Sequence, residues 1–163
     1  MVEWADFAEQ APRIAEIFVR RHAVADRLCM LATSRSDGYP RISPMEPWVF
    51  EGRLVLVGMP GTTKFRDLER DPRFCLHTAT VDPNVSDGDV KLWGEVVDVQ
   101  DPDLHRRFAD TCYAETGLDL RAQQFSPFFI GRLTGASSIE HEDGRLTIVI
   151  WKPGQGERVV HKT

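Results

Sequence analysis

The sequence has little cysteine and no long hydrophobic run, and each of these absences excludes a class of protein. Its three cysteines, Cys29, Cys75 and Cys112, lie far apart and form no C-x-x-C pair. A disulfide framework and the usual spacing of zinc ligands are therefore both missing, and we interpret the cysteines as buried thiols in a reducing compartment. No apolar run reaches the roughly 18 residues that a membrane-spanning helix needs.

The charge balance and the first residues argue against other partners. The formal net charge is -5, whereas a surface that binds nucleic acid or anionic lipid as a whole needs a basic field. The opening residues, MVEWADFAEQ, lack the basic start and apolar core of a signal peptide. We therefore expect a cytoplasmic protein that binds neither nucleic acid nor membranes, although a local basic pocket is compatible with the composition.

Motifs for catalysis by side chains are also missing. The sequence contains no G-x-S-x-G elbow, no H-E-x-x-H and no Cys/His cluster at zinc spacing. His141-Glu142 falls at a predicted hairpin tip without a second histidine, and His22, His105 and His161 fall near predicted element ends. We interpret all four histidines as surface residues, and the sequence predicts no catalytic side chain and no metal site.

What the chain does have is enough apolar surface for one compact domain over residues 1–163. With 163 residues, of which 42% are hydrophobic, a domain buries roughly two thirds of the surface that its unfolded chain exposes. Apolar spacing predicts an N-terminal helical region that Pro12 divides, with the better-formed helix running from Pro12 to His22. A second helix is predicted from an Asp101 cap and Pro102 to a stop at Gly117.

Short runs with a period of two residues, separated by turn signals, predict an antiparallel sheet. Glu-Gly and Asp-Gly pairs permit the positive φ of tight hairpins, which predicts a three-stranded meander over residues 28–59 and a hairpin at the C-terminal end. The predicted strands are residues 28–35, 39–50, 53–59, 73–81, 89–99, 126–142 and 145–151. Six or seven such strands with helices at the start and between strands favour a mainly β (α+β) fold, an antiparallel β-barrel flanked by helices.

The stretch MPGTTKFRDLERDP, residues 59–72, predicts a short surface helix with an unusual first turn. Phe65 and Leu68 lie three apart and face the core, and Thr62 or Thr63 is an ordinary cap. Lys64 is unusual, because a cation in the first turn opposes the helix dipole by about 0.3 to 1 kcal/mol. A bound phosphate that accepts hydrogen bonds from the threonines and from free N–H groups removes this conflict. A solvent-facing lysine on a capped helix is the alternative.

Three fragments in order, residues 38–46 (GYPRISPME), 53–76 and 92–99 (LWGEVVDV), resemble the pyridoxamine 5'-phosphate oxidase-like split β-barrel flavoproteins. The resemblance spans roughly residues 10 to 135, and its most specific piece is x-P-R-[VI]-S-P followed by [ST]-[ST]-K-x-x-[ND]-L-x-x-[DN]-P-R. It implies a split barrel that binds a flavin between the two subunits of a homodimer.

The resemblance also implies where the cofactor lies. The strand from Arg41 to Glu46 is expected along the isoalloxazine ring, with Val57 and Gly58 beside it and the phosphate on Thr63 and Lys64. The expected cofactor-binding residues are Arg41, Ile42, Ser43, Pro44, Met45, Glu46, Val57, Gly58, Thr62, Thr63 and Lys64. Candidates for the pocket or the substrate site are Trp48, His77 and Trp93, each of which is also an ordinary core residue in type. Further walls are expected from loops 82–88 and 117–127 and from the partner chain.

A flavin carries its own hydride chemistry, which agrees with the missing catalytic motifs. We therefore expect an oxidoreductase that binds FMN through its phosphate and transfers a hydride through N5 to or from a small-molecule substrate. The deazaflavin F420 is the alternative cofactor, with Arg20, Arg21 and His22 as cations for its anionic tail, and haem or no cofactor stays open. A carrier or sensor without turnover is the alternative of another class, and a barrel that has lost the site is a third. True vitamin B6 oxidation is doubtful, because Arg158 and His161 are three rather than two residues apart and fall on opposite faces of a strand.

Overall fold

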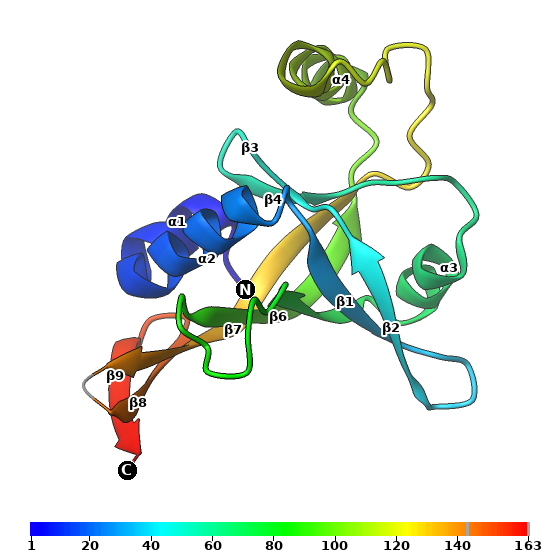
Figure 1. The fold of residues 1–163 in the computed structure, drawn as a ribbon. Coiled ribbons are helices and arrows are strands. Elements are labelled where there is room, and N and C mark those ends of the chain that lie inside the picture. Colours follow the sequence, from blue (N-terminus) through cyan, green and yellow to red (C-terminus); the bar gives the residue numbers. More distant parts are fainter. Residues whose placement is uncertain (143, 163) are drawn as a thin grey trace.

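The computed structural model of the protein describes residues 1–142 and 144–162, and Figure 1 shows its elements. The helices are α1 (Trp4–Gln10), α2 (Pro12–Val24), α3 (Thr63–Arg70) and α4 (Pro102–Thr116). The strands are β1 (Cys29–Ser34), β2 (Pro40–Met45), β3 (Trp48–Phe50), β4 (Arg53–Leu56), β5 (Arg73–Thr78), β6 (Asp89–Asp98), β7 (Phe129–Glu142), β8 (Arg145–Lys152) and β9 (Gly156–Lys162).

The nine strands found in residues 1–142 and 144–162 form one antiparallel sheet that does not close. Its order is β2-β1-β5-β6-β7-β4-β3, and β8 and β9 continue from β7 off this path. Within the described residues β2 and β3 end the path without pairing with each other, which leaves the barrel split. The mainly β fold with flanking helices is thus confirmed, although the sheet has nine strands rather than six or seven.

The predicted meander over residues 28–59 is partly confirmed, because both of its hairpins form, but residues 39–50 are not one strand. The run 39–50 breaks at Glu46-Pro47 into β2 and β3, which lie at opposite ends of the sheet. β2 pairs with β1, whereas β3 pairs with β4, and β4 pairs with β7. Because proline has no N–H to donate to a ladder, Pro47 suits the position where the chain leaves one strand pair and crosses to another.

Strand β9 is absent from the strands that turn signals predict, although Arg158 and His161 were considered as residues on opposite faces of a strand. Gly154 and Gly156 adopt φ of 76° and 65° and turn the chain back so that β9 pairs with β8. Figure 1 shows β8 and β9 as an arm on the side of the sheet away from α4. His161 lies beside β8, with its Nδ1 atom 3.3 Å from the Thr147 hydroxyl.

The predicted helices are confirmed. Pro12 begins α2 directly after α1 ends, and Asp101 caps α4 by accepting hydrogen bonds from the backbone N–H groups of Asp103 and Leu104 at 3.0 and 3.2 Å. Gly117 ends α4 with φ of 75°, a conformation that costs glycine little. Local chemistry therefore determines where α2 begins and where α4 begins and ends.

Within the described residues no helix combines the length and the hydropathy that crossing a bilayer requires.

Two hydrophobic clusters hold the elements together. The larger packs α1 and α2 on the sheet, where Phe7 meets Trp151 edge to face with centroids 5.0 Å apart. The smaller surrounds Phe108 of α4 with Phe125, Phe128 and neighbours from β3, β4 and β7. Helix α4 stands away from the sheet on two extended connections, and the smaller cluster packs it against the sheet (Figure 1).

The cysteines partly match their prediction as buried thiols. Cys29 and Cys112 are buried, while Cys75 is half-buried on β5. Burial raises the pKa of Cys29 to about 12, so this thiol stays protonated and unreactive at neutral pH.

Candidate functional site

Helix α3 begins at Thr63 with Thr62 in the N-cap position, as the sequence predicts. Phe65 and Leu68 are both 1% exposed and face the core. The Thr62 side chain makes no capping hydrogen bond, and its hydroxyl oxygen is buried without a partner among the described residues. A buried hydroxyl without a partner loses its hydrogen bonds to water, so this position favours a hydrogen-bonding ligand.

Lys64, in the first turn of α3, does not extend into bulk water. Its Nζ atom donates a hydrogen bond to the Pro44 carbonyl oxygen at 2.8 Å. Burial lowers the pKa of Lys64 below its ordinary value of 10.5, and nearby Glu46 offsets only part of this effect. The lysine therefore carries a partly desolvated charge beside the end of β2, where a second negative group would stabilise it.

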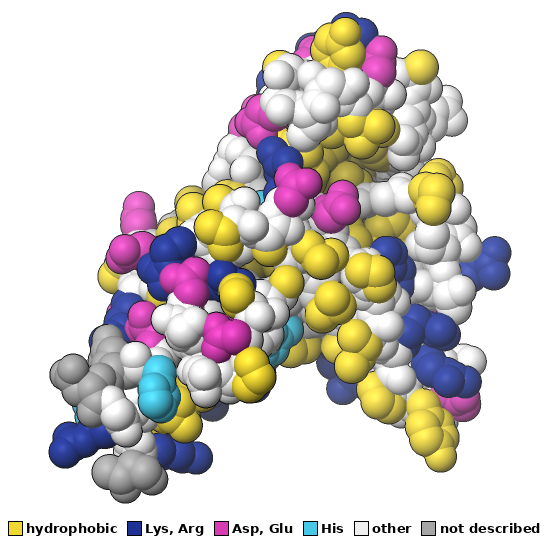
Figure 2. Space-filling view, in the orientation of Figure 1, with side chains coloured by type: hydrophobic (Ala, Val, Ile, Leu, Met, Phe, Trp, Pro, Cys, Tyr) yellow, Lys and Arg dark blue, Asp and Glu magenta, His cyan; other side chains and the backbone are white. Residues whose placement is uncertain are grey.

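A cavity of about 430 Å³ lies against this lysine. Its walls come from the end of β2, the segment after β4, the start of α3, and α4 with the segment that follows it. The lining residues are Leu28, Pro44, Met45, Glu46, Trp48, Val57, Gly58, Met59, Lys64, Cys112, Leu118, Leu120, Gln123 and Phe125. Figure 2 shows hydrophobic side chains gathered in the hollow between the α4 region and the rest of the molecule.

The structure brings together three separate parts of the predicted site in this cavity. They are the end of β2, the segment after β4 and the first turn of α3. The predicted residues that line it are Pro44, Met45, Glu46, Trp48, Val57, Gly58 and Lys64. A Cβ on Gly58 would lie 3.3 Å from the Phe65 ring, closer than ordinary contact, so a larger residue in this wall requires the buried ring to shift.

The remaining predicted cofactor residues lie beside the cavity rather than on its wall. Ile42 and Ser43 precede Pro44 on β2, and Ile42 is 72% exposed. Thr62 and Thr63 precede Lys64 at the start of α3. Arg41 was expected as a second cation for the cofactor, but its guanidinium is held by Asp67, with Nε 2.6 Å from Oδ2.

His77 and Trp93 do not line this cavity. Both lie on the half-exposed side of their strands, whereas Leu76 and Leu92 occupy the buried side. His77 borders a separate cavity of about 120 Å³. Its Nδ1 atom lies 2.6 Å from the Thr78 carbonyl oxygen, as expected of a structural histidine. Trp93 packs over Gly135, where a Cβ would come within 2.5 Å of its indole ring.

Trp48 is the one pocket candidate on the cavity wall, and two contacts fix its ring. The Arg27 guanidinium lies 4.1 Å from the ring centroid, and the ring meets Phe108 edge to face at 5.5 Å. Arg27 also pairs with Glu115 of α4 at 3.0 Å. Trp48 therefore links the body of the protein to α4.

Of the two loops expected as walls, only one lines this cavity. Residues Leu118, Leu120, Gln123 and Phe125 come from the predicted loop 117–127. Loop 82–88 lies elsewhere.

Asp87, in loop 82–88, pairs with two arginines of α2. It accepts hydrogen bonds from Arg20 at 3.1 Å and from Arg21 at 2.8 Å. Arg21 is 2% exposed and also donates to the Ala79 carbonyl oxygen at 2.7 Å. These two arginines hold the loop in place, and both of their charges are paired with Asp87.

Two histidines expected on the surface are also half-buried. The Nε2 atom of His22 lies 2.7 Å from the Pro47 carbonyl oxygen, and burial lowers the pKa of His22. The His105 ring stacks on Phe128, and its Nε2 atom lies 2.7 Å from the Val99 carbonyl oxygen.

No group of three or more His, Cys, Asp or Glu side chains placed to hold a metal occurs within residues 1–142 and 144–162.

The family model for pyridoxamine 5'-phosphate oxidase matches residues 18–133, a range that includes every predicted cofactor-binding residue. The chain belongs to this family. A search among curated proteins gives no significant match.

Solved structures share the fold at low sequence identity. A pyridoxamine 5'-phosphate oxidase-related, FMN-binding protein from Nostoc punctiforme has a TM-score of 0.62 and 13% identity, over 93% of this chain and 95% of that one. PhzG from Burkholderia lata, in complex with tetrahydrophenazine-1-carboxylic acid, has a TM-score of 0.62 and 10% identity, over 94% and 93% of the two chains. A heme-binding protein from Mycobacterium smegmatis has a TM-score of 0.58 and 18% identity, but only 57% of that chain is covered against 90% of this one.

Proposed function

We propose that the protein binds FMN in the cavity beside Lys64 and acts as an FMN-dependent oxidoreductase. The observation that carries this proposal is that two groups at the start of α3 both favour a ligand that accepts hydrogen bonds. The Lys64 ammonium is partly desolvated, and two residues earlier the Thr62 hydroxyl is buried without a partner in the described part of the chain.

A phosphate suits both groups. Its oxygens accept a charge-assisted hydrogen bond from Lys64 and ordinary ones from Thr62, Thr63 and the free N–H groups of the first turn of α3. Its charge also favours the protonated lysine and offsets the cost of burying the ammonium. Arg41, already paired with Asp67, positions α3 in this proposal instead of contacting the phosphate.

The remainder of the cavity suits a flat aromatic ring. Its volume of about 430 Å³ is within the range of small-molecule sites, and most of its wall is apolar. The end of β2 forms one part of the wall, and Val57 and Gly58, after β4, form another. In this proposal these residues orient the ring, while Trp48 and Phe125 exclude water from it.

FMN supplies the hydride transfer itself, through N5 of its ring. The chain's own residues bind the cofactor, orient the substrate and keep water out, so no side chain acts as a nucleophile. We also propose a homodimer in which a second copy covers the open side of the cavity. The free edge of β2 and the 72% exposed Ile42 support this arrangement.

FMN is favoured over F420 because Arg20 and Arg21, the expected cations for an anionic tail, are paired with Asp87. A relative with the same fold, from Nostoc punctiforme, is an FMN-binding protein, which supports a flavin as the cofactor. The vitamin B6 substrates of the family's namesake are not part of the proposal, since Arg158 and His161 lie at a spacing of three on β9.

The test begins with the purified protein. We expect the absorption spectrum of a bound flavin, release of FMN identified by mass, and bleaching of the flavin bands by NADH or NADPH under anaerobic conditions, followed by reoxidation by an acceptor. Binding of added F420 or haem but not FMN contradicts the cofactor. If FMN binds but cannot be reduced by a reductant and reoxidised by an acceptor, the proposed enzymatic activity is contradicted. The protein is then a flavin carrier or sensor.

A further inference from the structure

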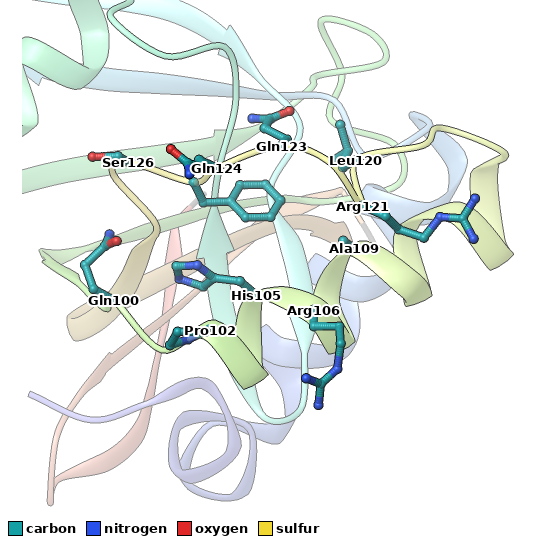
Figure 3. A pocket seen from close by; sticks show the side chains of 11 residues that line it. Gln100, Pro102, His105, Arg106, Ala109, Leu120, Arg121, Gln123, Gln124 and Ser126 are labelled. Atoms are coloured by element: carbon teal, nitrogen blue, oxygen red, sulfur yellow. The ribbon is translucent and has the colours of Figure 1, made fainter.

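A second cavity, of about 490 Å³, lies between α4 and the segment that returns from α4 to β7. Residues 123–126 form its roof, and α4 forms its floor (Figure 3). Its polar lining includes Gln100, His105, Gln123, Gln124 and Ser126. In Figure 3 the His105 ring projects from α4 toward this roof. The cavity is distinct from the one beside Lys64, although Gln123 and Phe125 stand between the two and line both.

His105 is held in a defined orientation with one ring nitrogen unused. Its ring stacks on Phe128 with centroids 4.5 Å apart and meets Phe125 edge to face at 5.5 Å. Its Nε2 atom lies 2.7 Å from the Val99 carbonyl oxygen, which can only accept, so Nε2 carries the hydrogen. In the neutral ring Nδ1 is then an acceptor, and no described residue hydrogen-bonds to it.

The charges around this cavity are already matched. Arg106 pairs with Asp103 at 2.8 Å, and Arg121 pairs with Asp119 through two bonds of 2.9 and 2.8 Å. No carboxylate lines the cavity. An anion would therefore compete with Asp103 and Asp119 for the arginines, and a cation would find no charged partner, so the site favours an uncharged ligand.

With the charged groups paired, the side-chain amides of the lining are the groups that can hydrogen-bond to a ligand. The side chains of Gln123 and Gln124 make no hydrogen bond within the described residues, and each offers a donor and an acceptor side by side. Ser126 adds a hydroxyl. Adjacent donors and acceptors of this kind complement an amide or lactam edge, while Ala109, Leu120 and Phe125 supply apolar surface for a flat ring.

From these observations we propose that the cavity binds an uncharged planar heteroaromatic ring that carries an amide or lactam edge, the chemistry shared by nicotinamide and by nucleobases. The ring packs against the Phe125 side of the cavity, and its polar edge bonds Gln124 and the Nδ1 atom of His105. This site goes beyond the proposed function and does not depend on it, because the two residues that bond the ring, Gln124 and His105, line this cavity and not the one beside Lys64.

The experiment uses nicotinamide as the probe and the full chain, with saturating FMN present if the chain binds it. Two-dimensional ¹H–¹⁵N NMR should show saturable shifts at the Gln124 side-chain amide and at residues 105 and 125. Nicotinate, its anionic counterpart, should bind about tenfold more weakly. Gln124→Leu should weaken nicotinamide binding about tenfold, because a hydrogen bond at an exposed site is lost without disturbing the core. His105→Phe, which keeps the stacked ring but removes Nδ1, should also weaken nicotinamide binding.

Gln155→Leu, a matched change in the exposed turn between β8 and β9, should leave the affinity unchanged. Thermal melting of each variant separates lost binding from lost folding. The proposal is overturned if shifts do not saturate, if nicotinate binds as tightly as nicotinamide, or if Gln124→Leu binds like the unchanged protein. Shifts confined to Gly58 and Lys64 also overturn it, because they place the probe in the other cavity.

Discussion

The Nε atom of Arg41 donates a hydrogen bond to the Oδ2 atom of Asp67 over 2.6 Å. The same carboxylate, 2% exposed, accepts from the Thr33 hydroxyl at 3.0 Å and from Arg70 at 3.3 Å. These bonds join β2, β1 and α3. They therefore fix the helix that begins with Lys64 against the strand that ends near Pro44, and the geometry of the proposed phosphate site depends on them.

Replacing this carboxylate should destabilise the protein. Asp67→Asn leaves the guanidinium groups of Arg41 and Arg70 without their negative partner, and we expect the free energy of unfolding to fall by about 3 kcal/mol. Urea unfolding followed by circular dichroism measures it. Asp103→Asn, which removes an exposed ion pair, should change stability by less than about 1 kcal/mol. Equal effects of the two changes would contradict the structural role of Asp67.

The stability difference between the protein and Asp67→Asn should depend on pH through the pKa of Asp67. Burial by itself would raise that pKa, but hydrogen bonds from Arg41, Thr33 and Arg70 outweigh it and hold the pKa below the ordinary 3.8. The stabilisation is therefore complete above that value and is lost as the pH falls through the lower folded-state pKa. The stability gap between the protein and Asp67→Asn should narrow in this acid range only.

The buried hydroxyl of Thr62 should matter for binding and not for folding. Thr62→Val keeps the shape but removes a hydroxyl that has no partner in the described residues, so the free protein should be as stable or about 1 kcal/mol more stable. FMN affinity should nevertheless fall roughly tenfold, because one phosphate hydrogen bond is lost. Fluorescence titration and thermal melting measure the two effects.

Thr80→Val is the matched control. The Thr80 hydroxyl donates to Asp89 at 2.8 Å, so its removal should cost about 1 kcal/mol of stability and leave FMN binding intact. If Thr62→Val lowers the stability and leaves the FMN affinity unchanged, the hydroxyl contributes to folding and not to FMN binding, which contradicts the prediction.

FMN affinity should depend on pH through Lys64. Burial lowers the pKa of this lysine below 10.5 in the free protein, and a bound phosphate favours the protonated form and raises the pKa again. Affinity should therefore be constant near neutral pH and fall as the pH rises through the free-protein pKa. Lys64→Met should lose this dependence and retain only that of the flavin's own ionisation. The same pH profile in both proteins would show that another group controls binding.

Local chemistry made much of the fold and part of the site predictable. The Asp101 cap, the Gly117 stop and the break at Pro12 act within a few residues, and the structure places each as expected. The unusual position of Lys64 in a first helical turn is equally local, and Lys64 lines the cavity.

Features that depend on distant parts of the chain were not predictable from one sequence. β2 and β3 are adjacent in sequence but separated by the whole sheet, since strand pairing joins β4 to β7. Arg41 looked available as a cation because its partner, Asp67, lies 26 residues away. The wall that α4 contributes through Cys112 depends in the same way on tertiary packing.

The irregular pairing of β6 and β7 offers a test of the fold itself. The register shifts between Trp93 and Gly94, and a Cβ on Gly94 would lie 1.9 Å from the Arg132 carbonyl oxygen. Gly94→Ala should therefore force the backbone apart and lower the free energy of unfolding by about 3 kcal/mol. Glu95→Ala, one residue further along β6, should cost less than about 1 kcal/mol in the same urea experiment. A Gly94→Ala variant as stable as its control would contradict this register.

The most direct test compares FMN with riboflavin, which lacks the phosphate, in the unchanged protein and in Lys64→Ala. If the phosphate rests on Lys64, the substitution should weaken FMN binding by about 1.5 to 3 kcal/mol, or roughly 10- to 150-fold, and leave riboflavin binding nearly unchanged. Lys152→Ala, an exposed lysine on β8, should alter neither affinity. Equal losses for FMN and riboflavin, or no loss for FMN, would contradict a phosphate site at the start of α3.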